Sequence, residues 1–206
     1  DKEVVLEAIN NDVYALQCAG ESLKKDKEFI LKALKHGADV QYADESLKKD
    51  KEVILEAIDN DSAHALDYAD DSLKKDREVV LASVREYGSS LEYADDSFKK
   101  DKEVVLEAVK TSGGAFEYAD DSLKKDKKFI LEAVKSNGAV LNVLDESFKK
   151  DKKHVLEAVK STPYSLRFAD DNFKKDKEVV LEAVKRDGCA LEHADDSFKK
   201  DKEIVF

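Results

Sequence analysis

The chain has 206 residues, of which 42% are hydrophobic and 40% are charged, and its formal net charge is −11. This charge argues against nucleic acids and anionic membranes as main partners, because both require basic patches that displace counterions. No stretch approaches the roughly 18–20 continuous apolar residues of a membrane span, so we expect no membrane insertion. No signal-peptide pattern opens the chain, and Cys18 and Cys189 are its only cysteines; both observations favour an intracellular location.

One phrase, YADDSFKKDKEVVLEAVK at residues 93–110, recurs in close variants along the whole chain. A fixed period in the range of roughly 20–50 residues is typical of solenoids and repeat arrays. We therefore predict one continuous array over residues 1–206. Because the chain stops within a new repeat, we also expect it to be an excerpt of a longer protein. The repeats start at residues 1, 26, 50, 76, 101, 126, 151 and 176, with a partial repeat at 201.

The first half of each repeat has the pattern of an amphipathic α-helix, as residues 101–112 illustrate. Apolar residues occupy positions 104–106, 108 and 109, whereas charged residues at 103, 107 and 110 fall on the opposite face. Asp101 fits the N-cap, and Gly113 fits a C-terminal stop that requires a positive φ angle. The equivalent stops are Gly37, Gly88, Gly138 and Gly188, with Pro163 in one repeat.

The second half of each repeat also has helical spacing. In residues 114–125, Ala115, Phe116, Ala119 and Leu123 share one face. Each repeat is thus predicted to be a hairpin of two helices of about 9–11 residues. One-residue changes in period around His36-Gly37 and Asp59–Ala63 predict a loop between the two helices.

Helices this short are marginal alone, so neighbouring repeats must supply the missing burial. The wide apolar arc of the first helix fits contacts with helices before and after it. We predict an all-α fold, a right-handed superhelical α/α solenoid of short hairpins with about 25 residues per repeat. A small residue recurs where adjacent helices are expected to pack closely, namely Ala8, Ala33, Ala57, Ala108, Ala133, Ala158 and Ala183, with Ser83 once.

The phrases DKEVVLEAVK at residues 101–110 and SLEYADDSFKK at residues 90–100 together resemble the helical repeat family catalogued as domain of unknown function four-one-one-six. The motif is an acidic-basic-acidic start, a Val-Val-Leu run, Ala-Val, Gly and a Leu-x-Tyr-Ala segment, and the resemblance covers the whole chain. It implies a stack of short helical repeats and no assigned activity. This chain departs from the family in its regularity and its richness in Lys-Lys and Asp-Asp.

Stacked repeats would align the acidic pairs into a ladder. Calcium requires several oxygens that converge in one loop, and no repeat has EF-hand spacing. A solvated face, whose like charges are offset by the lysines that follow, is the favoured interpretation, and a divalent-cation array is the alternative. The pairs are Asp70-Asp71, Asp95-Asp96, Asp120-Asp121, Asp170-Asp171 and Asp195-Asp196, with Asp44-Glu45 and Asp145-Glu146.

One aromatic position per repeat is a candidate partner-facing rim. Tyr42, Tyr68, Tyr93 and Tyr118 occupy it, followed by Val143, Phe168 and His193. Repeat proteins that stack a base on each unit show such a pattern, but the net charge argues against that role. Packing between adjacent helices is favoured, and a rim for a protein partner is the intermediate interpretation.

The remaining reactive residues do not converge. His36, His64, His154 and His193 lie at four different repeat positions, and Cys18 is far from Cys189 in an elongated array. We therefore predict no catalytic residue, no cofactor and no metal. Asn60-Asp61-Ser62 is a glycosylation tripeptide that is common by chance.

The regularity favours a non-enzymatic scaffold that contacts proteins, or the repeating body of a filament. The apolar faces at Val4/Val5/Leu6 and Ile204/Val205/Phe206 require a neighbour, which fits end-to-end extension. The alternative is a binding module of a larger effector-like, viral or protist protein whose activity lies outside this chain.

Overall fold

The computed structural model describes residues 1–60 and 63–200. Within those residues all regular structure is helical, and no β-strand is present. Contacts divide the chain into two compact units, Asp1–Phe98 and Lys99–Phe206, here named unit 1 and unit 2. The partial repeat at residue 201, with its apolar face Ile204/Val205/Phe206, and part of the Asn60-Asp61-Ser62 tripeptide lie outside the described residues.

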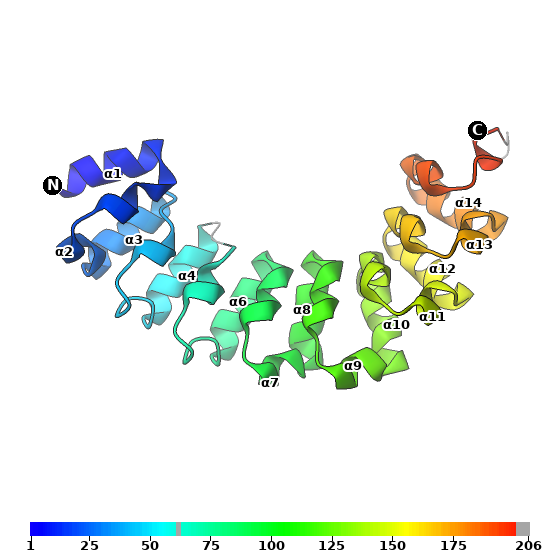
Figure 1. Cartoon of the computed structure of the whole chain (residues 1–206), viewed down its shortest axis with the longest axis horizontal. Coiled ribbons are helices and arrows are strands. Elements are labelled where there is room, and N and C mark those ends of the chain that lie inside the picture. Colours follow the sequence, from blue (N-terminus) through cyan, green and yellow to red (C-terminus); the bar gives the residue numbers. More distant parts are fainter. Residues whose placement is uncertain (61–62, 201–206) are drawn as a thin grey trace. The chain divides into compact units, whose positions relative to one another are not determined.

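Each repeat begins with an α-helix of nine or ten residues, and within each unit these helices lie side by side (Figure 1). In unit 1 they are α1 (Lys2–Asn11), α3 (Lys27–Lys35), α4 (Lys51–Asp59) and α6 (Arg77–Glu86). In unit 2 they are α8 (Lys102–Thr111), α10 (Lys127–Ser136), α12 (Lys152–Ser161) and α14 (Lys177–Arg186).

The rest of each repeat is a short middle helix followed by a single turn. The middle helices of unit 1 are η1 (Val13–Cys18), η2 (Val40–Tyr42), α5 (Ala65–Tyr68) and η3 (Gly88–Tyr93). Those of unit 2 are η4 (Gly113–Tyr118), η5 (Gly138–Val143), η6 (Pro163–Phe168) and η7 (Gly188–His193). The single turns are α2 (Glu21–Lys24), α7 (Asp96–Lys99), α9 (Asp121–Lys125), α11 (Glu146–Lys149), α13 (Asp171–Lys174) and η8 (Phe198–Lys200).

The first helix of each repeat begins where the sequence predicts. The Asp101 carboxylate accepts hydrogen bonds from the backbone N–H of Glu103 at 2.9 Å and of Val104 at 3.3 Å. These bonds satisfy donors that have no partner inside the helix. Aspartates at the equivalent positions cap α1, α3, α4, α6, α10, α12 and α14 in the same way.

The prediction of one continuous second helix is wrong. The middle helix η4 ends at Tyr118, and Ala119 and Asp120 are extended, with ψ angles of 152° and 148°. The backbone N–H of Asp120 donates to the carbonyl of Lys99 in the preceding repeat at 2.9 Å, so it is not available for a helical bond. The apolar spacing is nevertheless correct, because Ala115, Phe116, Ala119 and Leu123 are all buried.

The glycine stops occur where predicted, but the conformational reason is wrong except at Gly37. Among the described glycines only Gly37 has a positive φ, of 86°, and it lies in the predicted loop after α3. Gly113 and Gly138 instead lie against the next repeat. A Cβ added to Gly138 would lie 2.1 Å from the carbonyl oxygen of Ala158, and one added to Gly113 would lie 2.7 Å from backbone atoms of Ala139 and Val140. Backbone contact between repeats therefore requires these glycines.

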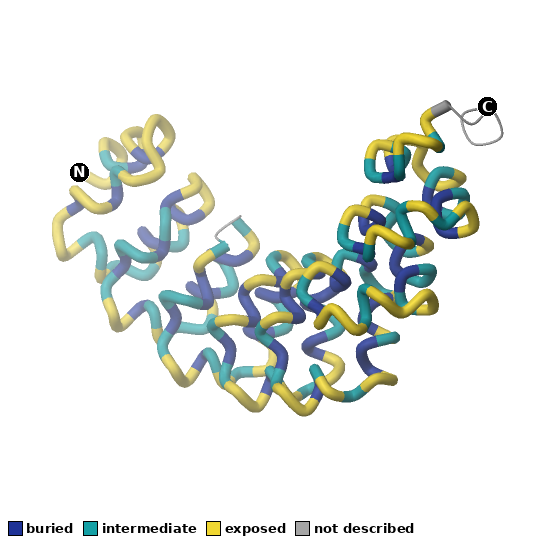
Figure 2. The backbone as a smooth tube through the Cα atoms, turned by 45° about the vertical axis from the view of Figure 1, so that its right-hand side comes forward, coloured by how far each residue is buried: buried dark blue, intermediate teal, exposed yellow. Residues whose placement is uncertain are grey.

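The core of each unit runs between the row of first helices and the row of middle helices (Figure 2). In α8 the buried residues are Val104, Val105, Ala108 and Val109, and the middle helices contribute residues such as Leu66, Leu91 and Leu141. Within unit 1, α4 contacts α3 and α6, and within unit 2, α12 contacts α10 and α14. The predicted α solenoid is confirmed; its handedness remains a prediction.

Candidate interaction surface

The first carboxylate of most acidic pairs caps the turn that follows it, and Asp145 is an exception because its side chain accepts no capping hydrogen bond. Asp120 accepts hydrogen bonds from the backbone N–H of Ser122 at 2.9 Å and from its hydroxyl at 2.6 Å. The bond from the hydroxyl is the main reason that the pKa of Asp120 lies below its ordinary value. The same pair of bonds holds Asp44, Asp70, Asp95 and Asp195.

The second carboxylate of each pair is exposed and lies near a lysine three or four residues later. Lys174 Nζ is 2.9 Å from Asp171, and Lys199 Nζ is 2.7 Å from Asp196. Where the second residue is Glu45, its partner Lys48 lies at 2.7 Å. Each turn thus offsets its own negative charge.

A further set of ion pairs joins successive repeats at most positions within each unit. Lys51 Nζ lies 2.8 Å from Asp76, the N-cap of α6, and 2.7 Å from Glu78. The Lys51 ammonium lowers the pKa of Asp76, and the two carboxylates raise the pKa of Lys51. The equivalent pairs are Lys2–Asp26, Lys27–Asp50, Lys102–Asp126 and Lys152–Asp176.

A backbone hydrogen bond accompanies these ion pairs at most steps. The N–H of Asp70 donates to the carbonyl of Lys48 in the preceding repeat at 3.0 Å. The equivalent bonds are Asp44 to Lys24, Asp95 to Lys74, Asp120 to Lys99, Asp170 to Lys149 and Asp195 to Lys174. Sequence analysis missed both sets of contacts. In the sequence, the ion pairs are indicated by a lysine that precedes a capping aspartate by about one repeat length.

The candidate tyrosine rim occupies the last position of the middle helices. Tyr42, Tyr68 and Tyr93 in unit 1 and Tyr118 in unit 2 are all half-buried, as are Val143, Phe168 and His193 at the equivalent positions. Burial is the main reason that the pKa values of Tyr68 and Tyr93 are raised, and the Asp67 carboxylate contributes to both. Each side chain at this position is therefore partly packed in the core and partly accessible.

The recurring alanines lie in the centre of the first helices. Ala33, Ala57, Ala108, Ala133, Ala158 and Ala183 are fully buried. Ala8 differs, because it is exposed and lines a shallow hollow of about 460 Å³ with Val4 and Cys18. No described helix covers that face of α1, so the packing of Ala8 between repeats stays a prediction.

The histidines and cysteines stay apart. His36 Nδ1 is 2.7 Å from the amide oxygen of Asn10, and His154 Nδ1 is 2.8 Å from Asp151. Cys18 and Cys189 are exposed in different units. In residues 1–60 and 63–200, no group of three His, Cys, Asp or Glu side chains is placed to hold a metal ion. No helix among those residues is long and apolar enough to cross a membrane.

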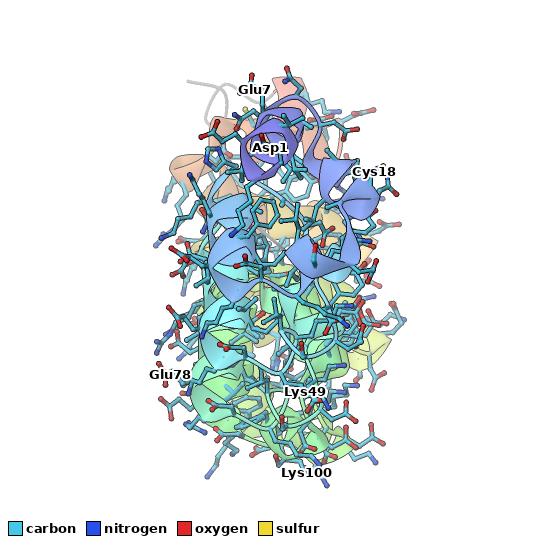
Figure 3. All side chains as sticks on the ribbon, turned by 90° about the vertical axis from the view of Figure 1, so that its left-hand side faces the viewer. Asp1, Glu7, Cys18, Lys49, Glu78 and Lys100 are labelled. Carbon is cyan, nitrogen blue, oxygen red and sulfur yellow. The ribbon has the colours of Figure 1, made fainter. Side chains whose placement is uncertain are left out.

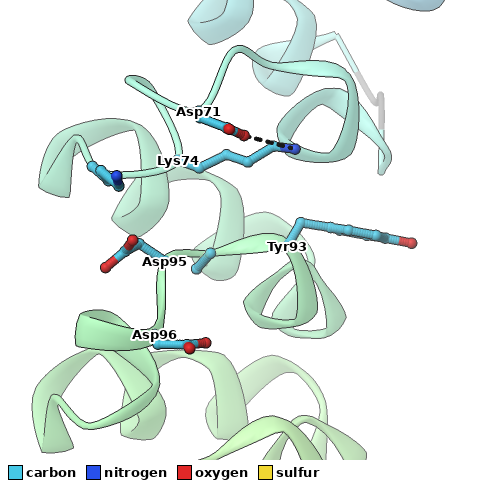
Figure 4. A pocket seen from close by; sticks show the side chains of 7 residues that line it. Asp71, Lys74, Tyr93, Asp95 and Asp96 are labelled. Atoms are coloured by element: carbon cyan, nitrogen blue, oxygen red, sulfur yellow. Dashed lines mark ion pairs between the residues drawn. The ribbon is translucent and has the colours of Figure 1, made fainter.

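Charged side chains line several of the surface hollows. Figure 4 shows one of about 310 Å³, where Asp71 faces Lys74, at 3.9 Å, and the Tyr93 side chain points away from both. Charged and polar side chains point outward around the ribbon (Figure 3), as labelled Glu7 and Glu78 show in unit 1. The same charged side chains therefore recur on the surface from one repeat to the next.

Searches of curated proteins and of solved structures found no match to the chain. One family model, described as Domain of unknown function (DUF4116), matches repeatedly. The matched segments are 1–40, 35–74, 50–99, 76–124, 101–149, 126–174, 151–199 and 176–206. These overlapping matches follow the repeats seen in the structure, and the chain belongs to the DUF4116 family.

Proposed function

We propose that the chain is a non-enzymatic scaffold that binds proteins along the side of its stacked repeats. The observation that carries the proposal is the half-buried aromatic position that ends successive middle helices, beside surface carboxylates. Aromatic residues are enriched at protein interfaces because a ring contributes a large contact area with few rotatable bonds. The net charge of −11 supports protein rather than nucleic acid as the partner.

The absence of catalysis is part of the same proposal. Most of the shifted pKa values belong to surface aspartates and lysines that cap helices or join repeats, such as Asp76 and Lys51, and those of Tyr68 and Tyr93 are raised mainly by burial. Groups of this kind stabilise structure, whereas a catalytic group needs a shifted pKa inside a cleft beside a reacting partner.

Site-specific photocrosslinking tests the scaffold function. A photoreactive amino acid would replace Ser89, which is exposed in η3, and in a control it would replace Glu86, which is exposed in α6 of the same repeat. We expect a discrete partner protein to crosslink at position 89 and not at 86 in cells of the source organism. Equal labelling at the two positions, or none at either, would contradict the proposal.

A filament is a second candidate, favoured by the uncovered face of α1. Val4 is 66% exposed and lines the same hollow as Ala8. Another repeat could cover this face, supplied by a further part of the polypeptide or by another molecule. Negative-stain electron microscopy should show fibres if molecules join there, and Val4→Glu should abolish them. Discrete particles at high concentration would reject the filament.

The remaining alternative is a binding module of a larger effector-like, viral or protist protein. Its activity would reside in a domain outside residues 1–206. A parent sequence consisting of the same repeats alone would count against it.

A further inference from the structure

Two aromatic clusters occupy matching places in the two units. His64 and Tyr164 stand at the same position of their repeats, four residues before the rim residue. The His64 ring lies 6.5 Å from Tyr68 in its own repeat and 6.4 Å from Tyr93 in the next, both edge to face. We name these three residues the unit 1 aromatic cluster.

The unit 2 aromatic cluster has the same construction. Tyr164 lies 6.1 Å from Phe168 in its own repeat and 4.7 Å from His193 in the next. In the described repeats 76–100 and 101–125, the position of His64 and Tyr164 holds Ser89 and Gly114, which cannot bridge two rim residues. Tyr14 holds this position in the first repeat, but Cys18 replaces the rim aromatic there, and among the described residues no ring pair involves Tyr14.

The unit 2 cluster already holds a cation. The guanidinium carbon of Arg167 lies 4.7 Å from the ring centre of Tyr164 and 5.1 Å from that of Phe168. These distances are within the range of cation–π attraction, to which arginine adds planar stacking. The rings and backbone at this repeat position therefore accommodate a guanidinium.

The unit 1 cluster has the opposite charge at that position. Asp67 stands where unit 2 has Arg167, and Glu92 stands there in the next repeat. The Asp67 carboxylate contributes to the raised pKa values of the Tyr68 and Tyr93 phenols, and the Glu92 carboxylate contributes to the raised pKa of Tyr93. Negative charge therefore lies close to the rings.

The chain's own cations leave part of this cluster available. Lys48 Nζ lies 5.9 Å from the Tyr68 ring centre, but it is paired with Glu45 at 2.7 Å. Within residues 1–60 and 63–200, no lysine or arginine lies over the ring of Tyr93. The His64 ring is exposed beside it.

We propose that the unit 1 aromatic cluster binds an arginine side chain presented by a basic segment of a partner protein, with Asp67 and Glu92 pairing the guanidinium. The inference rests on the protein-binding function proposed above and specifies the chemistry of the partner. Arginine is favoured over lysine because its planar fork can stack on a ring and bond to a carboxylate at the same time.

Fluorescence anisotropy with a labelled peptide of four Arg-Gly repeats tests this inference on the whole chain. Matched peptides carry lysine or neutral citrulline in place of arginine. We expect the arginine peptide to bind more tightly than the lysine peptide, and the citrulline peptide to show no binding. The double variant Asp67→Asn/Glu92→Gln should weaken arginine binding at least about tenfold, the equivalent of roughly 1.4 kcal/mol.

Glu117→Gln is the matched control, since Glu117 occupies the same repeat position beside Tyr118 but Gly114 replaces the bridging ring. It should change affinity less than about twofold, within ordinary variation for a rim charge. Equal losses in the control and the double variant would mean that the peptide binds the acidic surface diffusely, and the proposal would be wrong. Circular dichroism of each variant establishes that the fold is intact.

A gain of binding provides the second test. Arg167→Glu removes the cation from the unit 2 cluster and places a carboxylate where unit 1 has Asp67. Calorimetry should then count two arginine peptides per chain instead of one. A count that stays at one would overturn the assignment of rings plus carboxylate as the recognition elements. If crosslinking at residue 89 succeeds while no arginine peptide binds, this inference fails and the scaffold function stands; if both fail, both are wrong.

Discussion

In unit 1, the step from repeat 50–75 to repeat 76–100 has both recurring polar contacts. Lys51 pairs with Asp76, and the N–H of Asp95 donates to the carbonyl of Lys74. In unit 2, the described repeat 126–150 lacks the backbone hydrogen bond to the preceding repeat and the ion pair to the following repeat. Between the described residues Asp145 and Lys124 no backbone hydrogen bond forms.

Sequence differences account for both exceptions in unit 2. Leu144 stands where the other repeats have alanine, and its larger side chain is buried beside the bond that is missing. Between repeats 126–150 and 151–175, the Asp151 carboxylate instead lies 2.8 Å from His154 Nδ1 in its own repeat. Among the described residues, no ion pair joins Asp151 to Lys127.

Other polar bonds replace those that are lost. Asn137 Nδ2 donates to the carbonyl of Val109 in the preceding repeat at 2.9 Å. The N–H of Gly138 donates to Thr162 Oγ1 in the next repeat at 3.0 Å. The comparison teaches that polar contacts between repeats are exchangeable, whereas close packing of small buried residues recurs within both units, at Ala33, Ala57 and Ser83 and at Ala108, Ala133, Ala158 and Ala183.

The largest effect is expected from breaking that common packing. Ala108→Leu places three more carbon atoms between α8 and its neighbours, and overpacking of this kind costs about 3 kcal/mol of unfolding free energy. Urea unfolding measures the cost, and hydrogen exchange should show the loss concentrated in the adjoining repeats. Ala8→Leu is the control, and as an exposed change it should stay within about 0.5 kcal/mol. Uniform loss of protection along the chain would contradict nearest-neighbour stacking.

A slightly smaller effect is expected at the backbone contact between repeats 126–150 and 151–175. Gly138→Ala brings a Cβ against the Ala158 carbonyl and should lower the unfolding free energy by about 2 kcal/mol. Gly188→Ala should be neutral or stabilising by up to about 1 kcal/mol, since no described atom lies within 4 Å of the added carbon. Similar losses for both variants would show that glycine is needed for its conformation rather than for close approach.

The substituted polar bond in unit 2 should contribute less. Thr162→Val keeps the side-chain shape but leaves the buried Gly138 N–H without its acceptor, at a cost of about 1–2 kcal/mol. Ser112→Ala, at the same repeat position, removes a hydroxyl that makes no hydrogen bond to a described residue. Thermal unfolding of the two variants compares them; equal melting temperatures would mean that the bond does not hold the step.

The smallest effect is expected from the exposed ion pairs. Lys51→Met should lower the melting temperature slightly at pH 7, and Lys127→Met should leave it unchanged. Because the pKa of Asp76 is depressed in the folded state, its contribution is present above its ordinary value of 3.8 and is lost as pH falls through the folded value. The difference between Lys51→Met and the parent chain should therefore vanish near pH 2 and shrink in 1 M salt. A difference that persists at pH 2 would point to lost packing of the lysine stem.

The sequence predicts the period, the first helix and its aspartate cap because these depend on local residues. It does not predict the break at Ala119-Asp120, since the acceptor of the Asp120 N–H is Lys99 in another repeat. The glycines illustrate the same limit. Gly138 is conspicuous in the sequence, but a glycine is required there because the Ala158 carbonyl, twenty residues away, leaves no room for a Cβ.

The candidate surface was predicted in part. The rim position of Tyr68 and Tyr93 follows from aligning the repeats, and their half-burial agrees with a place at the edge of the apolar face. The bridging rings are not evident from residue type, because His64 and Tyr164 differ chemically and share only their repeat position. Aligning the repeats at that position would have paired them, although not their distances to the next repeat.

The double use of the capping aspartates has a consequence for how such a chain can lengthen. Asp76 pairs with Lys51 of the preceding repeat and also caps its own helix, α6. The residue after it is Arg77, at the position where other repeats have a lysine. Each repeat thus carries an aspartate for the ion pair with the preceding repeat and a basic residue for the ion pair with the following repeat. A duplicated 25-residue segment would arrive with both halves in place, and gene duplication could extend the array without any compensating mutation.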